Sequence, residues 1–430
     1  MLEIGQEMMI KLLHFADAHI DLARQGRRDP ETGLPVRVLD FLNALDRIVD
    51  TAVSEKVDLV IFAGDAYRDR TPAPTYQREW GKRIMRLSEA GIQTLLVVGN
   101  HDVSPAAGRA HTLQEFDTLQ VPNIHVISKP CLLGPDDLNG LPLQVIGIPW
   151  LNRSGLAAVF ADKDSAADEI RGQLEDQITR IIEEFFENLN PALPAVLTSH
   201  ISVQGASYGN ERSVMLGKDL VLTASLVKDK RLDYVALGHI HKAQNLNPDG
   251  QPPVIYPGSI ERVDFGEIED EKTFVIAEIE KGKPAKFKWM KLEGRPFISR
   301  SVTVDDPEGV QAQIMKAIPT PDAIRDAMFR LILTYPRDWE ALIDEAAIRR
   351  AAETAFEFHL IRRPLSPARL RLPGDIEIAS LSPGELLALY WKTVAPETNE
   401  IDVLNELAGE IIQAVETGAG IPENREEFMQ

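Results

Sequence analysis

Residues 95–102 read LLVVGNHD, an apolar run that ends in a glycine and three polar side chains. A short, continuous apolar run bounded in this way is typical of a strand that is buried on both faces of a parallel sheet. In open α/β sheets, ligands bind beyond the carboxyl ends of the strands. Asn100, His101 and Asp102 are therefore expected to lie at a functional site.

Four further motifs repeat this arrangement along the chain. Each directly follows an apolar run, and each ends in Asp or His. They are Asp17-Ala18-His19, Gly64-Asp65, Ser199-His200 and Gly238-His239-Ile240-His241. Because the carboxyl ends of parallel strands meet at one edge of a sheet, we expect these motifs to form one polar cluster.

Helical and strand patterns alternate from residue 10 to about 150. Helices are predicted at 38–52 and 77–89, between strands at 10–15, 57–63 and 94–98. This order predicts a parallel sheet flanked by helices. A helix at 168–188 and strands at 195–198 and 234–237 follow. The runs 254–256, 273–279 and 285–290 are interpreted as an antiparallel meander, and the whole predicts a four-layer α/β/β/α sandwich.

The pattern changes after Gly294, where a smaller β-α-β-α-β order begins. Two helices with apolar faces, at 383–394 and 401–415, follow a proline-punctuated basic stretch. We therefore divide the chain into an N-terminal extension (1–9), the sandwich domain (10–294), a small α/β capping domain (295–365), a linker with a helical pair (366–420) and an acidic tail (421–430).

The composition is that of a globular protein. Of 430 residues, 44% are hydrophobic and 26% are charged, which excludes a disordered, collagen-like or disulfide-scaffold class. The net charge of −20 argues against a simple nucleic-acid binder, but it is concentrated in two acidic segments and leaves room for a basic groove. The single cysteine, Cys131, excludes an intrachain disulfide and favours a reducing, cytoplasmic location.

The residue types of the five motifs suit metal binding. Asp, Asn and His together provide oxygen and imidazole ligands, which fit manganese, iron or zinc better than magnesium or calcium. A carboxylate can bridge two cations, and two cations about 3.5–4 Å apart can stabilise both the attacking and the leaving oxygen of a phosphoester. The pattern therefore indicates two-metal phosphoester hydrolysis.

The five motifs, in this order, resemble those of the calcineurin-like metallophosphoesterases over about residues 10–290. The resemblance narrows to the bacterial SbcD nuclease family, the bacterial branch of the double-strand-break repair nucleases. It is carried by Gly205-Ala206-Ser207, by 236–244 (ALGHIHKAQ) and by 256–267 (YPGSIERVDFGE). The small second domain and the paired C-terminal helices also resemble that family.

The resemblance implies roles for individual residues. One divalent metal ion, expected to be Mn²⁺, would bind Asp17, His19 and His241. A second would bind Asn100, His200 and His239, and Asp65 would bridge the two. His101 would stabilise the phosphate and protonate the leaving oxygen, while Asp102 would orient His101.

The resemblance also implies a function and partners. The family cleaves double-stranded DNA ends in the 3′-to-5′ direction and cuts single strands endonucleolytically, as the nuclease subunit of an SbcCD-type DNA repair complex. The capping domain would position DNA, and the chain would be a homodimer within a heterotetramer. The helical pair would bind the coiled-coil ATPase SbcC through Leu386, Leu389, Tyr390, Leu404, Leu407 and Ile411.

Three arginines are candidates for phosphate contacts: Arg68, Arg70 and Arg109. Archaeal and eukaryotic members of the family carry a His three residues after the bridging Asp, where this chain has Arg68. An Arg cannot transfer protons, but it can hold a phosphate through two hydrogen bonds. A solvated charged loop is the alternative interpretation.

Other functions remain open at this stage. A stand-alone phosphodiesterase or phosphatase acting on small or protein substrates would use the same metal centre. A DNA-end-binding scaffold without activity is a further alternative, although every expected position carries a competent side chain. Residues 16–21 (ADAHID) also resemble a sister branch of SbcD-like exonucleases that has a different ATPase partner.

Overall fold

The computed structural model describes residues 9–21, 27–103, 109–151, 167–209, 220–365 and 382–394, with helical pieces at 404–405, 407–409 and 411–412. The chain divides into a larger unit, residues 1–298 with 326–328, and a smaller unit, residues 299–325 with 329–430. Nearly all of the predicted N-terminal extension, the predicted linker at 366–381 and the acidic tail lie outside the described residues.

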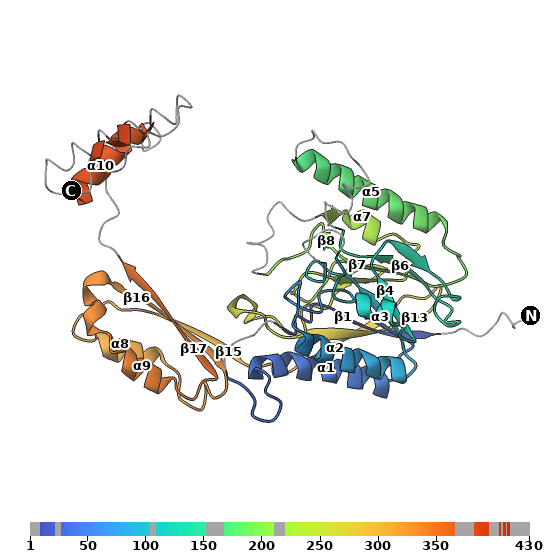
Figure 1. The fold of residues 1–430 in the computed structure, drawn as a ribbon, viewed down its shortest axis with the longest axis horizontal. Helices are drawn as coiled ribbons and strands as arrows, with labels where there is room; N and C mark the ends of the chain where they lie inside the picture. The colour runs from blue at the N-terminus through green and yellow to red at the C-terminus, as the bar shows by residue number, and fades with distance from the viewer. Residues whose placement is uncertain are drawn as a thin grey trace, which may run out of the picture. The chain divides into compact units, whose positions relative to one another are not determined.

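Two six-stranded sheets stack face to face in the larger unit (Figure 1). The first, in the order β14-β13-β1-β2-β3-β4, contains β1 (Ile10–Phe15), β2 (Leu59–Phe62), β3 (Gln93–Val97), β4 (Ile124–Ile127), β13 (Thr273–Ile279) and β14 (Lys286–Lys291). The second, in the order β11-β12-β10-β7-β6-β5, contains β5 (Cys131–Leu133), β6 (Gln144–Ile148), β7 (Ala195–His200), β10 (Tyr234–Gly238), β11 (Gln244–Asn245) and β12 (Val254–Tyr256).

Helices cover the outer faces of both sheets. The apolar sides of α1 (Val36–Ser54) and α2 (Pro74–Glu89) pack on the first sheet, and α5 (Ala167–Glu187) packs on the second. Short elements complete the unit: α3 (Gln114–Thr118), β8 (Ser202–Val203), β9 (Val221–Leu222), α7 (Ala224–Val227) and the 3₁₀ turn η1 (Phe265–Glu267). The four-layer α/β/β/α sandwich predicted from the sequence is confirmed.

The predicted antiparallel meander is wrong in one strand. β13 and β14 do pair antiparallel at the edge of the first sheet. β12 instead lies parallel to β10 in the second sheet. A three-residue apolar run that is buried throughout does not encode which of two sheets it joins, so the sequence pattern could not place it.

A buried histidine lies between the two sheets. His14 on β1 faces the Tyr234 hydroxyl and the Leu237 carbonyl of β10, each at 3.2 Å. Burial lowers the pKa of this imidazole to about 3, so the ring is neutral. Its Nε2–H therefore donates to Leu237, and its Nδ1 accepts from Tyr234. The side chain bridges the sheets and has a structural role.

The sheets approach most closely where β2, β7 and β10 end. His200 Nδ1 donates a hydrogen bond to the Ala63 carbonyl oxygen at 2.7 Å. A Cβ placed on Gly238 would collide with the same oxygen. Only glycine fits at 238, because the backbones of the two sheets nearly touch there.

The smaller unit contains a three-stranded sheet in the order β15-β16-β17. Its elements are β15 (Phe297–Thr303), α8 (Val310–Ala317), β16 (Met328–Pro336), η2 (Arg337–Leu342), α9 (Glu345–Ala351), β17 (Glu357–Leu365) and α10 (Pro383–Val394). Phe329 of β16 stacks on Phe358 of β17, and the guanidinium of Arg349 of α9 lies 6.0 Å from the Phe358 ring. None of the helices that the structure describes is long and apolar enough to cross a bilayer.

Replacing Gly238 by Ala should destabilise the larger unit. The added methyl group meets a backbone carbonyl that cannot rotate away, so the free energy of unfolding should fall by about 1–3 kcal/mol. The matched control is Gly81→Ala in α2, where a Cβ meets no atom within 4 Å. That change should stabilise by about 0.5–1 kcal/mol. Urea denaturation followed by tryptophan fluorescence measures both, and equal midpoints would contradict the close approach of the sheets.

Candidate metal centre

The structure brings all seven predicted ligands to one place. Three of the five motifs follow β1, β2 and β3 of the first sheet, and two lie at the ends of β7 and β10 of the second. The side chains concerned are Asp17, His19, Asp65, Asn100, His200, His239 and His241. All are buried except His241, which is partly exposed.

One cluster consists of Asp17, His19 and His241, whose ligand atoms lie within 4.8 Å of one another. Nδ1 of His19 donates to the Tyr67 carbonyl at 3.3 Å, and Nδ1 of His241 donates to Glu267 Oε1 at 2.7 Å. The two Nε2 atoms therefore point lone pairs at each other across 3.1 Å. A cation between these nitrogens and the Asp17 carboxylate would turn that repulsion into ligation, so the donor set fits a metal ion.

The second cluster centres on Asn100. Its Oδ1 lies 2.9 Å from His200 Nε2 and 3.1 Å from His239 Nδ1. The Trp150 ring packs against the rings of both histidines, with centroids 6.2 and 5.1 Å away. Because Nδ1 of His200 is engaged by Ala63, its Nε2 is the atom available to a metal ion.

Asp65 lies between the two clusters. Its Oδ2 is 3.4 Å from His200 Nε2 and 3.9 Å from His19 Nε2, while Oδ1 accepts the backbone N–H of His101 at 2.8 Å. One oxygen therefore faces histidines of both clusters, as a bridging carboxylate requires. Asp17 also lies within 4.8 Å of Asp65 and His200, so it reaches toward both clusters.

The charges of the cluster favour a cation. Burial opposes ionisation of Asp65, but the neighbouring histidines, His200 foremost, hold the pKa of this carboxyl well below its usual range. Burial would lower the pKa of His200, but the Asp65 and Asp17 carboxylates outweigh it and raise the pKa to about 9. A divalent cation at this position would replace the His200 proton, as metal binding to imidazole commonly does.

Four of the seven ligand residues have a left-handed backbone. The φ angles are 53° at Asp17, 41° at His19, 65° at Asp65 and 98° at His239. This region is sparsely populated by residues other than glycine, and such strain persists only where the surroundings over-determine it. It aims these side chains inward immediately after each strand ends.

The predicted role of Asp102 is wrong. Its buried carboxylate accepts hydrogen bonds from the backbone N–H groups of Asp65, Ala66 and Gly99 and from the Thr112 hydroxyl, at 2.9–3.1 Å. Asp102 therefore ties the loop after β2 to the loop after β3. Burial, reinforced by the Asp65 carboxylate, raises the pKa of Asp102 to about 6.

His101 is oriented by a backbone group instead. Its Nδ1 donates to the Arg68 carbonyl at 2.7 Å. The Arg68 N–H in turn donates to the buried Asp21 carboxylate at 2.5 Å. Residue 68 therefore positions His101 through its main chain, which explains how an Arg can occupy this position.

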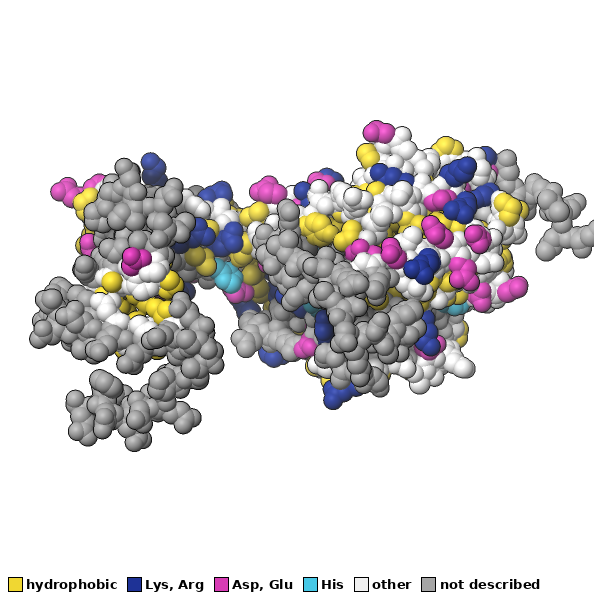
Figure 2. Space-filling model, turned by 90° about the horizontal axis from the view of Figure 1, so that it is seen from above, with side chains coloured by type: hydrophobic (Ala, Val, Ile, Leu, Met, Phe, Trp, Pro, Cys, Tyr) yellow, Lys and Arg dark blue, Asp and Glu magenta, His cyan; other side chains and the backbone are white. Residues whose placement is uncertain are grey.

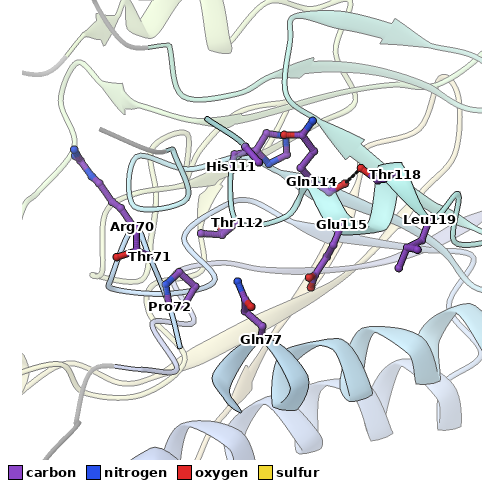
Figure 3. Close-up of a pocket in the computed structure, with 11 residues that line it drawn as sticks. Arg70, Thr71, Pro72, Gln77, His111, Thr112, Gln114, Glu115, Thr118 and Leu119 are labelled. Atoms are coloured by element: carbon purple, nitrogen blue, oxygen red, sulfur yellow. Dashed lines mark hydrogen bonds between the residues drawn. The ribbon is translucent and has the colours of Figure 1, made fainter. Parts of the chain in front are cut away.

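The three candidate arginines are exposed. Arg70 lines a pocket of about 660 Å³ together with Gln77, His111 and Glu115. Figure 3 shows that Arg70 points away from Gln77 and Glu115, which point toward each other across the pocket. No proposed metal ligand lines this pocket, and its half-buried Glu115 carboxylate disfavours a phosphate inside it. The structure brings none of the three arginines into a described hydrogen bond with the metal cluster.

Sequence reasoning missed three residues that touch the ligands. Trp150 packs on His200 and His239, and Glu267 bonds His241 with help from Lys272. A signal existed for Trp150, because it follows the apolar strand β6 as the ligands follow theirs. Glu267 ends the run 256–267, but no spacing rule links that position to His241.

The chain belongs to the calcineurin-like phosphoesterases, since the model of that family matches residues 10–243, more than half of its 430 residues. Members of this family use a dinuclear metal centre, and the paired clusters fit one. The protein is therefore a metal-dependent phosphoesterase.

Its curated relatives include SbcD proteins, the nuclease components of SbcCD. The chain is 25% identical to the SbcD protein of Bacillus subtilis, over 67% of this chain and 71% of that protein. It is 27% identical to the SbcD protein of Escherichia coli K12, over 56% and 59%. It is 25% identical to the uncharacterized metallophosphoesterase YhaO of Bacillus subtilis, over 62% and 57%. The chain thus spans less than two thirds of the last two relatives.

Mn²⁺ should stabilise the folded protein, and Asp65→Ala should remove most of this effect. At a free Mn²⁺ concentration 100 times the dissociation constant, each site adds about 2.7 kcal/mol. Loss of the oxygen that faces both clusters weakens both sites. Differential scanning calorimetry with Mn²⁺ or with EDTA measures the change. His125→Ala, outside the cluster on β4, is the matched control and should keep the full effect. An equal Mn²⁺ response in both variants would refute the site.

Proposed function

We propose that this protein is a two-metal DNA nuclease, the nuclease subunit of an SbcCD-type repair complex, with Mn²⁺ as its metal. The observation that carries the proposal is the juxtaposition of His101 with two ligand clusters that share Asp65. The backbone N–H of His101 donates to Asp65 Oδ1, and its ring lies 5.2 Å from the His19 ring. The similarity to two SbcD proteins supports DNA as the substrate.

The chain's own residues define the chemistry at the leaving group. Two bound cations would polarise the phosphodiester and supply an ionised water near neutral pH. His101 is partly exposed, and its Nδ1–H is held by Arg68. Its Nε2 is therefore the atom that faces substrate, and in the imidazolium form it donates a proton to the leaving oxygen. The Asp65 contact fixes this ring relative to both clusters.

The surface is compatible with a polyanionic substrate. Figure 2 shows Lys and Arg interspersed with Asp and Glu on the visible face of the larger unit, so the net charge of −20 is not spread as a uniform acidic layer. Arg68 and Arg70 follow the bridging Asp65 and are exposed. We assign phosphate contacts to them and to Arg109, and the small α/β unit is assigned to DNA positioning.

The C-terminal helices support a protein partner. On α10 and the helical pieces after it, Leu386, Tyr390, Leu407 and Ile411 are 37–47% exposed, whereas Leu404 is half-buried. The Leu389 side chain lies outside the described residues. Exposed apolar residues at helical spacing suit packing on another helix pair, so we assign this face to a coiled-coil ATPase. The similarity to YhaO leaves the sister-branch ATPase as the alternative to SbcC.

His101→Ala should abolish DNA cleavage and leave binding intact. Loss of a general acid lowers the rate by about 10²–10⁴-fold. The assay uses end-labelled duplex DNA with Mn²⁺, with metal binding and gel-shift affinity measured alongside. His125→Ala serves as the matched control and should cleave normally. Substantial cleavage by His101→Ala would refute its role.

A small diester distinguishes the competing functions. The nuclease proposal expects Mn²⁺-dependent shortening of DNA together with turnover of bis-p-nitrophenyl phosphate. Turnover of the diester alone, unchanged when SbcC and ATP are added, would favour a small-substrate phosphodiesterase. Turnover of neither substrate would favour the non-catalytic scaffold.

The double variant Leu386→Asp/Tyr390→Asp should lose the ATPase partner. Charged side chains on the apolar face cannot be buried against a helix pair without a large desolvation cost. Co-purification with SbcC and with the sister-branch ATPase should fall at least 10-fold for the true partner. Leu342→Asp, at an exposed apolar residue of η2 (49% exposed), is the control. Equal loss in both variants would contradict the assignment.

A further inference from the structure

A buried ion pair lies behind His241, and the proposed function gives it no role. Glu267 ends η1 and Lys272 directly precedes β13. The Lys272 side chain is fully buried, and its Nζ lies 2.7 Å from Glu267 Oε2. Burying both charges costs desolvation energy that their attraction often fails to recover. A pair retained beside a metal cluster therefore points to a role other than stability.

The two oxygens of Glu267 have different partners. Oε1 accepts the Nδ1–H of His241 at 2.7 Å. Oε2 accepts from Lys272, from the Val263 N–H at 2.9 Å and from the Ser259 hydroxyl at 3.3 Å. The carboxylate cannot rotate without breaking several of these bonds. It therefore fixes the proton of His241 on Nδ1 and leaves Nε2 for a metal ion.

Lys272 also acts on the main chain of the same ligand. Its Nζ lies 3.4 Å from the His241 carbonyl oxygen and 2.8 Å from Ser259 Oγ. The Ser259 N–H donates to that carbonyl at 3.2 Å. One network thus holds both the ring and the backbone of His241.

Two other ligand histidines have a different kind of support. His19 and His200 donate their Nδ1–H to the backbone carbonyls of Tyr67 and Ala63. A carboxylate partner makes the opposite ring nitrogen a stronger ligand than a carbonyl does. The two metal clusters therefore differ in how their imidazoles are tuned.

We propose that Glu267, held in place by Lys272, is a positioning residue that sets the metal affinity of the Asp17, His19 and His241 cluster. The cluster of Asn100, His200 and His239 is independent of it. This inference rests on the metal ligands of the proposed function and does not depend on the substrate.

The test is Mn²⁺ binding by the full chain, measured by isothermal titration calorimetry and by electron paramagnetic resonance of free Mn²⁺. The wild type should bind two ions. Glu267→Ala should bind one ion with unchanged affinity and the other about 10- to 100-fold more weakly. Glu267→Gln keeps an acceptor for the His241 proton, so its loss should be smaller. This milder variant also serves if Glu267→Ala does not fold.

Glu261→Gln is the matched control. Glu261 is a buried carboxylate of the same loop, but it accepts from the backbone N–H groups of Arg262 and Arg295. Its loss should lower thermal stability and leave both Mn²⁺ affinities unchanged, which separates positioning from general destabilisation.

A double-mutant cycle with His241→Ala completes the test. If Glu267 acts through His241, adding Glu267→Ala to His241→Ala should cause no further loss of affinity. Additive losses, equal weakening of both sites or unchanged binding in the Glu267 variants would overturn the inference. A wild type that fails to bind two ions would instead overturn the metal centre of the proposed function.

Discussion

The carbonyl oxygen of Ala63 is the contact on which the centre depends. It accepts the His200 imidazole from the opposite sheet, and Gly238 packs against it because it has no side chain. At this spacing the ends of β2, β7 and β10 share one space, so residues far apart in the sequence become neighbours. The 3.1 Å approach of the His19 and His241 rings requires it. A wider gap between the sheets would separate the two halves of each cluster.

Asp102 holds this arrangement from below. Its carboxylate gathers donors from the loops after β2 and β3, which carry Asp65, Asn100 and His101. The left-handed backbones at Asp17, Asp65 and His239 each cost about 1–3 kcal/mol. Such strain is tolerated where dense hydrogen bonding leaves no alternative. The centre is therefore preorganised by the protein's own groups.

The sequence allowed the sandwich and the metal ligands to be predicted, because one rule links them: polar residues directly after apolar strands gather at one sheet edge. That rule does not say which sheet a short buried strand joins, and so β12 was misplaced. It also does not say what a carboxylate beside a ligand bonds to. Asp102 was assigned to the His101 ring but binds backbone N–H groups, and the Glu267–His241 contact spans 26 residues. Such contacts arise from loop paths between the sheets, which carry no periodicity.

The most direct test of the account is anomalous diffraction from crystals grown with Mn²⁺, recorded at the manganese absorption edge. The account predicts two peaks with Asp65 between them. One should lie among Asp17, His19 and His241, and the other among Asn100, His200 and His239. A single peak, or peaks away from these side chains, would contradict the claim that the meeting of the two sheets builds a two-metal centre.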